Sequence, residues 1–118
     1  MTSDVQVMIP VDEVFSHVVK WAAEKGILEK ATPATQMLKM TEEVGELAKA
    51  IRNGDMKEVE DSIGDCMVVL TILAAMYQRD ARNCYEGSWK VIRGRTGQMV
   101  NGVFIKQEDL DKLEAPNE

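Results

Sequence analysis

The sequence has few of the residues that bind soft metal ions or act as bases near neutral pH. Its 118 residues include two cysteines and one histidine. Cys66 and Cys84 form no CxxC motif, so we expect reduced thiols and no zinc site. His17 lies far in the sequence from any acidic cluster. Catalysis by a histidine base is therefore not expected.

Long apolar runs are also absent. The longest, CMVVLTILAAM at 66–76, is about half of the roughly 20 residues that a membrane span needs. The N-terminal MTSDVQVMIP has no basic segment followed by an apolar stretch, unlike a signal peptide. The sequence therefore predicts a cytoplasmic protein with no membrane contact.

Positive charge is in deficit, with 14 Lys and Arg against 20 Asp and Glu. A net charge of −6 argues against a nucleic-acid partner, because such proteins attract phosphate with a basic face. An acidic protein that binds phosphate usually needs a cation between the two. The length predicts a single domain, 1–118, whose small core favours a homo-oligomer.

Apolar residues recur at helical spacing through most of the chain, which predicts an all-α fold. Four main helices are expected in a core of about 11–94. The first ends near Gly26, and a loop follows to residue 31. Thr32 and Pro33 start the second. The expected helices are 11–25, 33–52, 55 to about 78, and 83–93, the last starting at Asn83.

The C-terminal part has a different character. Asn101-Gly102 lies between two short apolar runs and predicts a β-hairpin, followed by a short helix, so this part covers about 96–113. The third helix is apolar on nearly every side from residue 67 to 76, as buried helices are. We therefore expect a helical bundle that oligomerisation completes.

Two of these helices carry acidic faces. Gln36, Lys39, Glu43 and Glu46 share one face of the second helix, and Asp61 and Asp65 share a face of the third. Two neighbouring helices could thus direct their carboxylates into one cleft. Oxygen ligands without histidine or thiolate suit Mg²⁺, with Mn²⁺ as its substitute. The alternative is a pair of solvated faces with helical ion pairs.

Glycines adjoin these acids inside the helices: Gly45 precedes Glu46, and Gly64 precedes Asp65. An interior glycine costs about 1 kcal/mol relative to alanine. We therefore expect a close approach to the backbone there, either by a metal-bound triphosphate or by another helix.

Four segments carry a resemblance to a known family: WAAEKGI (21–27), QMLKMTEEVGELAKAI (36–51), IGDCMVVLTILA (63–74) and GQMVNGVFIKQEDL (97–110). Their order and spacing resemble the MazG-like nucleoside triphosphate pyrophosphohydrolases, particularly the small single-domain type of phages and bacteria. The similarity covers most of 14–110. It implies an all-α homodimer or homotetramer that cleaves NTPs or dNTPs between the α and β phosphates, giving NMP and pyrophosphate. A phage-encoded protein of this kind would act in the host cytoplasm.

The resemblance also implies metal ligands, from an ExxE motif and a following ExxD motif. Glu43 and Glu46 match the first, and Asp65 matches the end of the second. Ser62 stands where the second motif begins with an acid, and a hydroxyl is a poor replacement for a carboxylate.

We expect Asp61 to replace the missing acid, because it shares a face with Asp65. Glu58 lies on that face too, but its position three residues after Asp55 predicts a capping box that would occupy its side chain. Glu60 points about 140° away from Asp65.

Further roles follow from the expected chemistry. Glu43 or Glu42 would accept the proton of the attacking water. Trp21 matches an early tryptophan of the family and would stack on or wall the base, although a core position is the alternative. The residues expected to contact substrate are Trp21, Gln36, Lys39, Lys90, Arg93 and Arg95.

Other functions remain open at this stage. Dimeric dUTPase and phosphoribosyl-ATP pyrophosphohydrolase share the acidic-helix plan. A non-enzymatic oligomerisation or regulatory module is a second alternative, in which Ser62 marks lost catalysis. A ferritin-like di-iron site is excluded, because it needs two Glu-x-x-His motifs.

Overall fold

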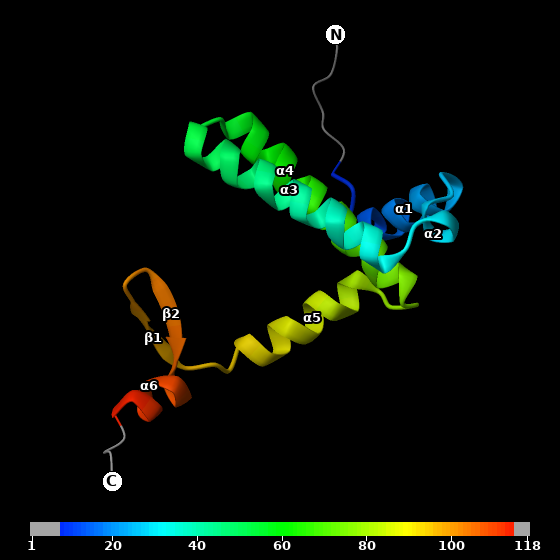
Figure 1. The fold of residues 1–118 in the computed structure, drawn as a ribbon. Coiled ribbons are helices and arrows are strands. Elements are labelled where there is room, and N and C mark those ends of the chain that lie inside the picture. The colour runs from blue at the N-terminus through cyan, green and yellow to red at the C-terminus, as the bar shows by residue number, and fades with distance from the viewer. Residues whose placement is uncertain (1–7, 115–118) are drawn as a thin grey trace. The chain divides into compact units, whose positions relative to one another are not determined.

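The computed structural model describes residues 8–114 and divides the chain into two compact units, Met1–Cys84 and Tyr85–Glu118. The predicted all-α architecture with a C-terminal hairpin is confirmed (Figure 1). The elements of the described residues are α1 (Val11–Glu24), α2 (Ile27–Lys30), α3 (Pro33–Asn53), α4 (Met56–Met76), α5 (Ala81–Ile92), β1 (Gly97–Val100), β2 (Val103–Lys106) and α6 (Gln107–Glu114).

Helices α3 and α4 lie side by side and form the centre of the first unit (Figure 1). Thr32 caps α3 as predicted: its hydroxyl accepts the Thr35 N–H at 3.1 Å, and Pro33 occupies the first helical position. The helix ends at Asn53, and Gly54 follows it with a φ of 66°, which is available to glycine without strain. The short connection makes the two helices antiparallel neighbours.

The backbone N–H groups of the turn between α3 and α4 donate to carbonyl groups at the end of α3. Gly54 N–H donates to Ile51 O at 3.2 Å, and Asp55 N–H donates to Ala50 O at 3.1 Å, which together form a Schellman motif. Asp55 caps α4 by accepting the Glu58 N–H at 3.2 Å. Because Asp55 N–H is already used, the Glu58 side chain does not complete the expected capping box.

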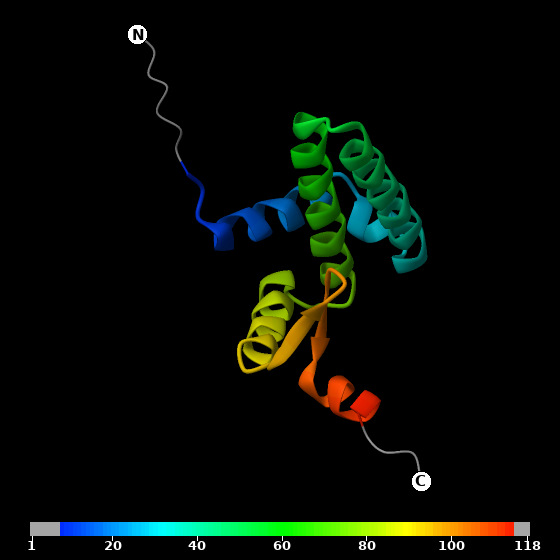
Figure 2. The ribbon, with the colours of Figure 1, turned by 90° about the vertical axis from the view of Figure 1, so that its left-hand side faces the viewer.

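Helix α1 packs against α4 (Figure 2). The short helix α2 follows α1 in the chain, where the sequence predicted a loop. Gly26, with a φ of 79°, separates the two. Four residues suffice for α2 because Lys30 N–H and Ala31 N–H donate back to Gly26 O and Ile27 O at 2.9 Å each. The predicted end of α1 near Gly26 is confirmed.

The described core of the first unit is made of small and aliphatic side chains. It also contains polar ones, which matter for the site below. The buried residues are Ala22, Glu43, Ala50, Ser62, Cys66, Val69, Thr71 and Ile72. Buried acids are rare in proteins unless they are paired or bind a metal.

The fourth helix, α5, begins earlier than predicted. Asn83 lies inside it, and Asp80 is the residue that precedes it. The Asp80 carboxylate accepts the Arg82 N–H at 2.8 Å, so a capping acid upstream takes the role that the sequence assigned to Asn83.

The second unit contains most of α5, the hairpin β1–β2 and α6. The strands are antiparallel, with Gly97 opposite Lys106 and Val100 opposite Val103. Asn101 and Gly102 connect them with positive φ values of 51° and 83°, as a two-residue hairpin turn requires. Among residues 8–114, no helix combines the length and apolar character needed to cross a bilayer.

Candidate metal centre

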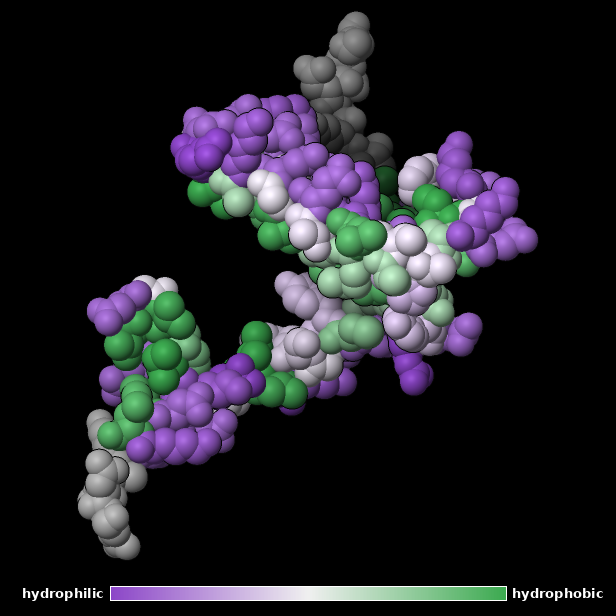
Figure 3. Space-filling view, in the orientation of Figure 1, coloured by the Kyte–Doolittle hydropathy of each residue, from purple (hydrophilic) through white to green (hydrophobic). Residues whose placement is uncertain are grey.

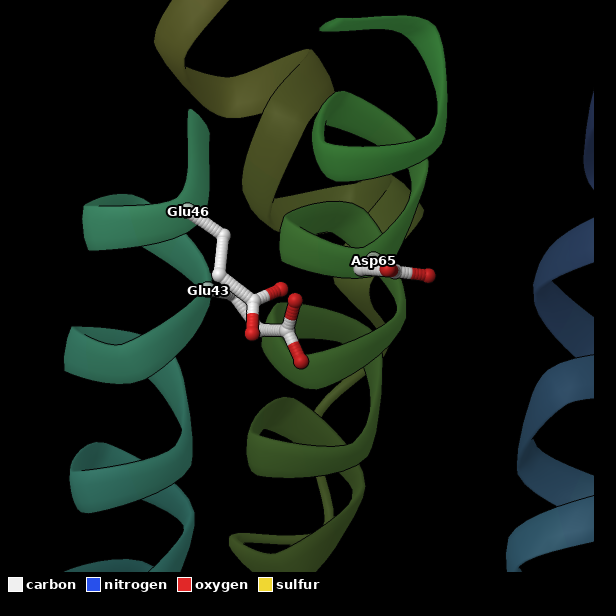
Figure 4. Close-up of side chains that lie close together, drawn as sticks. All are labelled: Glu43, Glu46 and Asp65. Carbon is white, nitrogen blue, oxygen red and sulfur yellow. The ribbon is translucent and has the colours of Figure 1, made fainter. Parts of the chain in front are cut away.

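Three carboxylates meet on the α3–α4 pair. Glu43 and Glu46 extend from α3, one turn apart, and Asp65 extends from α4 (Figure 4). One oxygen of each lies within 4.8 Å of the others. The spacing follows from the helical period, since positions i and i+3 share a face and α4 runs alongside that face.

Glu43 is the buried member of this cluster, with 6% of its surface exposed. Its Oε1 lies 3.2 Å from Lys39 Nζ, whereas its Oε2 has no hydrogen-bond partner among the described residues. A buried acceptor without a partner costs about 1–3 kcal/mol or more when it is charged. This oxygen therefore has lone pairs available to coordinate a cation.

The charges of the cluster act on one another. The negative charge of Glu43 raises the pKa of Glu46 above its ordinary value. The hydrogen bond to Glu43, helped by the charge of Glu42, raises the pKa of Lys39. The clustered acids therefore favour any added positive charge, whether a proton or a metal ion.

The donor set fits a hard divalent cation. All three side chains offer carboxylate oxygens, and no described histidine or thiol is part of the group. Mg²⁺ and Mn²⁺ prefer such ligands, and Mg²⁺ keeps several waters rather than demanding a full protein shell. The residues present fit a metal of this kind.

Asp61, the predicted fourth ligand, lies outside the three-carboxylate cluster. Its Oδ1 forms an ion pair with Lys57 Nζ at 3.1 Å. Asp61 is rotated about 40° from Asp65 around α4, in the direction of α1. The two line the same groove along α1, but of them only Asp65 also reaches the carboxylates of α3.

Ser62, at the position where the resemblance expects an acid, is fully buried. Its hydroxyl donates to Glu58 Oε1 over a long 3.4 Å bond. This contact was not expected, because the capping box predicted from Asp55 and Glu58 would have occupied the Glu58 side chain.

A groove of about 710 Å³ runs between α1 and α4 beside the cluster. Asp65 belongs to both the groove and the cluster, so the two are continuous. Its apolar side comes mainly from α1, and its acidic side from α4. The lining residues are Val11, Val14, Phe15, Val18, Glu60, Asp61, Gly64, Asp65, Met67, Val68 and Thr71.

The two glycines that raised a question in the sequence have open space beside them. A Cβ atom at Gly45 or Gly64 would meet no described atom within 4 Å outside its own helix backbone. Packing against another described helix of the first unit therefore does not account for them. Gly64 faces the groove, where a side chain would reduce the available space.

The remaining predicted residues lie at several places. Gln36 is half-buried on α3, and Trp21, 46% exposed on α1, is not part of the groove lining. Lys39 is at the cluster, with Glu42 Oε1 also 3.7 Å from its Nζ. Three cations belong to the second unit: Lys90, which pairs with Glu86 at 3.4 Å, and the exposed Arg93 and Arg95.

Comparisons with known proteins give the family of the chain. The family model described as "MazG nucleotide pyrophosphohydrolase domain" matches residues 31–90, which contain all three clustered carboxylates. The chain belongs to this family, whose members are hydrolases.

One relative is an uncharacterized 18.2 kDa protein from the rep-hol intergenic region of Haemophilus phage HP1. It is 34% identical over 74 residues, which cover 63% of this chain and 45% of the phage protein. The chain thus spans less than half the length of that relative. No solved structure matches the present chain.

Proposed function

We propose that the protein is a Mg²⁺-dependent nucleoside triphosphate pyrophosphohydrolase, which cleaves the α–β phosphoanhydride of NTPs or dNTPs to NMP and pyrophosphate. The carrying observation is the cluster of Glu43, Glu46 and Asp65, in which a buried Glu43 oxygen lacks a partner. Family membership supports the reaction class. We further propose that the protein acts in the cytoplasm, where nucleoside triphosphates are abundant.

The three carboxylates would hold the metal. A divalent ion there would neutralise phosphate oxygens and make a nearby water more acidic. Glu43 is buried within the cluster, whereas Glu42 is exposed and outside it. Of these two residues, Glu42 is therefore the one that we assign as proton acceptor for the attacking water, while Glu43 serves as a ligand.

The groove beside Asp65 would receive the nucleoside. Its volume of about 710 Å³ lies within the range of small-molecule sites, and its wall on α1 is apolar, as a base requires. Gly64 leaves room at the groove surface. Lys39, at the cluster, would contact phosphate. The phosphate contacts expected for Lys90, Arg93 and Arg95, which belong to the second unit, stay a prediction from the sequence. Trp21 and Gln36 remain candidates for substrate contact.

We also propose a homodimer or homotetramer. Apolar side chains stay exposed in stripes on both α3 and α4, at seven-residue spacing on α3 and at i, i+4, i+7 on α4. Figure 3 shows apolar surface along one edge of this helix pair. Such stripes are typical of helices that pack against partner helices. The exposed residues are Met37, Val44 and Ile51 on α3, and Ile63, Met67 and Leu70 on α4.

The proposal is tested by measuring pyrophosphate release from a panel of NTPs and dNTPs with Mg²⁺, and again with EDTA. We expect pyrophosphate and NMP in equal amounts with Mg²⁺, and none with EDTA. Release of inorganic phosphate instead would place the cleavage at a different bond. The absence of turnover on every nucleotide would contradict the enzymatic proposal.

A further inference from the structure

The metal centre has one carboxylate fewer than the family motif, because Ser62 stands where the ExxD motif begins with an acid. Ser62 is fully buried on the side of α4 that packs against α3, so it lies next to the cluster rather than in solvent. A serine hydroxyl carries no charge, and it needs an acceptor when it is buried. The residue that accepts from it therefore brings its own polar group next to position 62.

That residue is Glu58, one turn before Ser62 on α4. The Schellman motif at the end of α3 uses Asp55 N–H for Ala50 O, which leaves no cap donor for the Glu58 carboxylate. The carboxylate extends along α4 to Ser62 Oγ, 3.4 Å away. The contact joins side chains four residues apart, which share a face of the helix.

Rotation around α4 separates Glu58 from Asp61. At about 100° per residue, Ser62 lies about 60° from Asp65 on the side of α3. Glu58 lies about 20° from Asp65 on that same side, whereas Asp61 lies about 40° away on the side of α1. The ion pair with Lys57 and the position on the α1–α4 groove agree with this direction for Asp61.

We infer that Glu58 supplies the fourth carboxylate of the metal centre, and that the buried Ser62 hydroxyl directs it there. The glutamate side chain from the preceding turn then replaces an acid at position 62. Glu58 is exposed and outside the three clustered carboxylates, so its Oε2 would have to turn toward the ion while its Oε1 keeps accepting from Ser62. This inference rests on the metal site of the proposed function, and it assigns Asp61 to the groove.

The test measures Mn²⁺ affinity by electron paramagnetic resonance, without nucleotide, so it does not depend on activity. We expect Glu58→Gln to weaken binding by about 10-fold or more, since groups around a metal typically contribute 10–100-fold. The amide oxygen of glutamine can still accept from Ser62, so the fold is preserved. Asp61→Asn, and Glu24→Gln on α1 as a control, should bind Mn²⁺ like the unchanged protein.

A second background sharpens the test. Ser62→Glu restores the acid of the motif, so adding Glu58→Gln to it should cost little further Mn²⁺ affinity. If Ser62→Glu does not fold, Glu58→Asp, which shortens the side chain, should weaken Mn²⁺ binding in the natural background.

The outcomes separate this inference from the proposed function. Unchanged Mn²⁺ affinity in Glu58→Gln, together with loss in Glu46→Gln, would overturn the role of Glu58 and leave the metal centre standing. A loss in Asp61→Asn instead would return the fourth position to Asp61. No Mn²⁺ binding by the unchanged protein would overturn both proposals.

Discussion

The two units of the chain differ in what they bury. The α3–α4 pair of the first unit encloses a carboxylate and a hydroxyl, Glu43 and Ser62, which are 6% and 0% exposed. In the second unit no residue from Tyr85 to Leu113 is buried. Large apolar side chains such as Trp89 and Phe104 are instead 56% and 46% exposed.

This difference indicates that the α3–α4 pair, and not the second unit, holds polar side chains in fixed positions. A buried carboxylate keeps its place only if the surrounding helices fix it, and α3 and α4 do so with capped ends and a two-residue turn. A two-stranded hairpin is marginal in water without further packing. We therefore expect changes on α3 and α4 to affect chemistry, and changes in the second unit to affect local order.

The largest effect is expected for Glu46→Gln. Loss of this ligand should lower kcat for pyrophosphate release by about 1,000-fold, because a metal contributes several kcal/mol to the transition state. The variant should also lose Mn²⁺ binding. Without metal it should melt at a higher temperature than the unchanged protein, since the repulsion between Glu43 and Glu46 is relieved. A variant that keeps full turnover would show that the carboxylates hold no metal.

Glu42→Gln distinguishes proton transfer from metal binding. We expect kcat to fall by about 100-fold, as is usual when a general base is removed. Mn²⁺ affinity should stay unchanged, because Glu42 lies outside the cluster. Equal losses of affinity and kcat would assign Glu42 to the metal rather than to the water.

The exposed stripes test the oligomer. Ile51→Lys and Leu70→Lys should each weaken self-association by about 10–100-fold, from the loss of a buried aliphatic side chain worth about 1.5–3 kcal/mol. Light scattering after size exclusion would follow the change in mass. Leu70→Met, which preserves the apolar volume, should leave association almost unchanged. A chain that is already monomeric would contradict the proposed assembly.

In the second unit, Gly97→Ala should loosen the hairpin. A Cβ at Gly97 would collide with the Ile105 carbonyl and the Phe104 ring. We expect a local cost of about 1–3 kcal/mol and faster hydrogen exchange over residues 97–106. Gly94→Ala is the matched control, because a Cβ there meets nothing within 4 Å. Mn²⁺ affinity should be equal in both variants if the units act separately.

The smallest expected effect is on pH dependence. Glu43 raises the pKa of Glu46 above its ordinary 4.5, so the folded, metal-free protein holds this proton more tightly than the unfolded chain does. The resulting stabilisation is complete below about pH 4.5 and is lost as pH rises through the raised pKa. Melting temperatures in EDTA should therefore fall over this interval more in the unchanged protein than in Glu46→Gln. Parallel curves would contradict the coupling.

Much of this architecture could be predicted from the sequence, because its signals are local. Thr32-Pro33 and Asn101-Gly102 act within a few residues, and the structure confirms the boundaries that they predict. Asn83 was wrong as a helix start, because Asp80 also had a capping side chain and lay upstream. Two competing local signals cannot be ranked by pattern alone.

The candidate site was less predictable. Helical periodicity predicted that Glu43, Glu46 and Asp65 could face one cleft, and the structure places these three side chains together. It could not reveal that Asp55 N–H is taken by the end of the preceding helix, which frees Glu58 for Ser62. The α1–α4 groove was also missed, because it depends on how two amphipathic helices cross, and the sequence contains no signal for that angle.

The two thiols have a practical consequence. Cys84 is exposed and is the last residue of the first unit, whereas Cys66 is buried and burial raises the pKa of its thiol. A maleimide dye should therefore label Cys84 selectively, because thiolate and access both control the reaction. Labelled in this way, Cys84 would carry a single reporter dye within α5, and its anisotropy would report the local order of that helix.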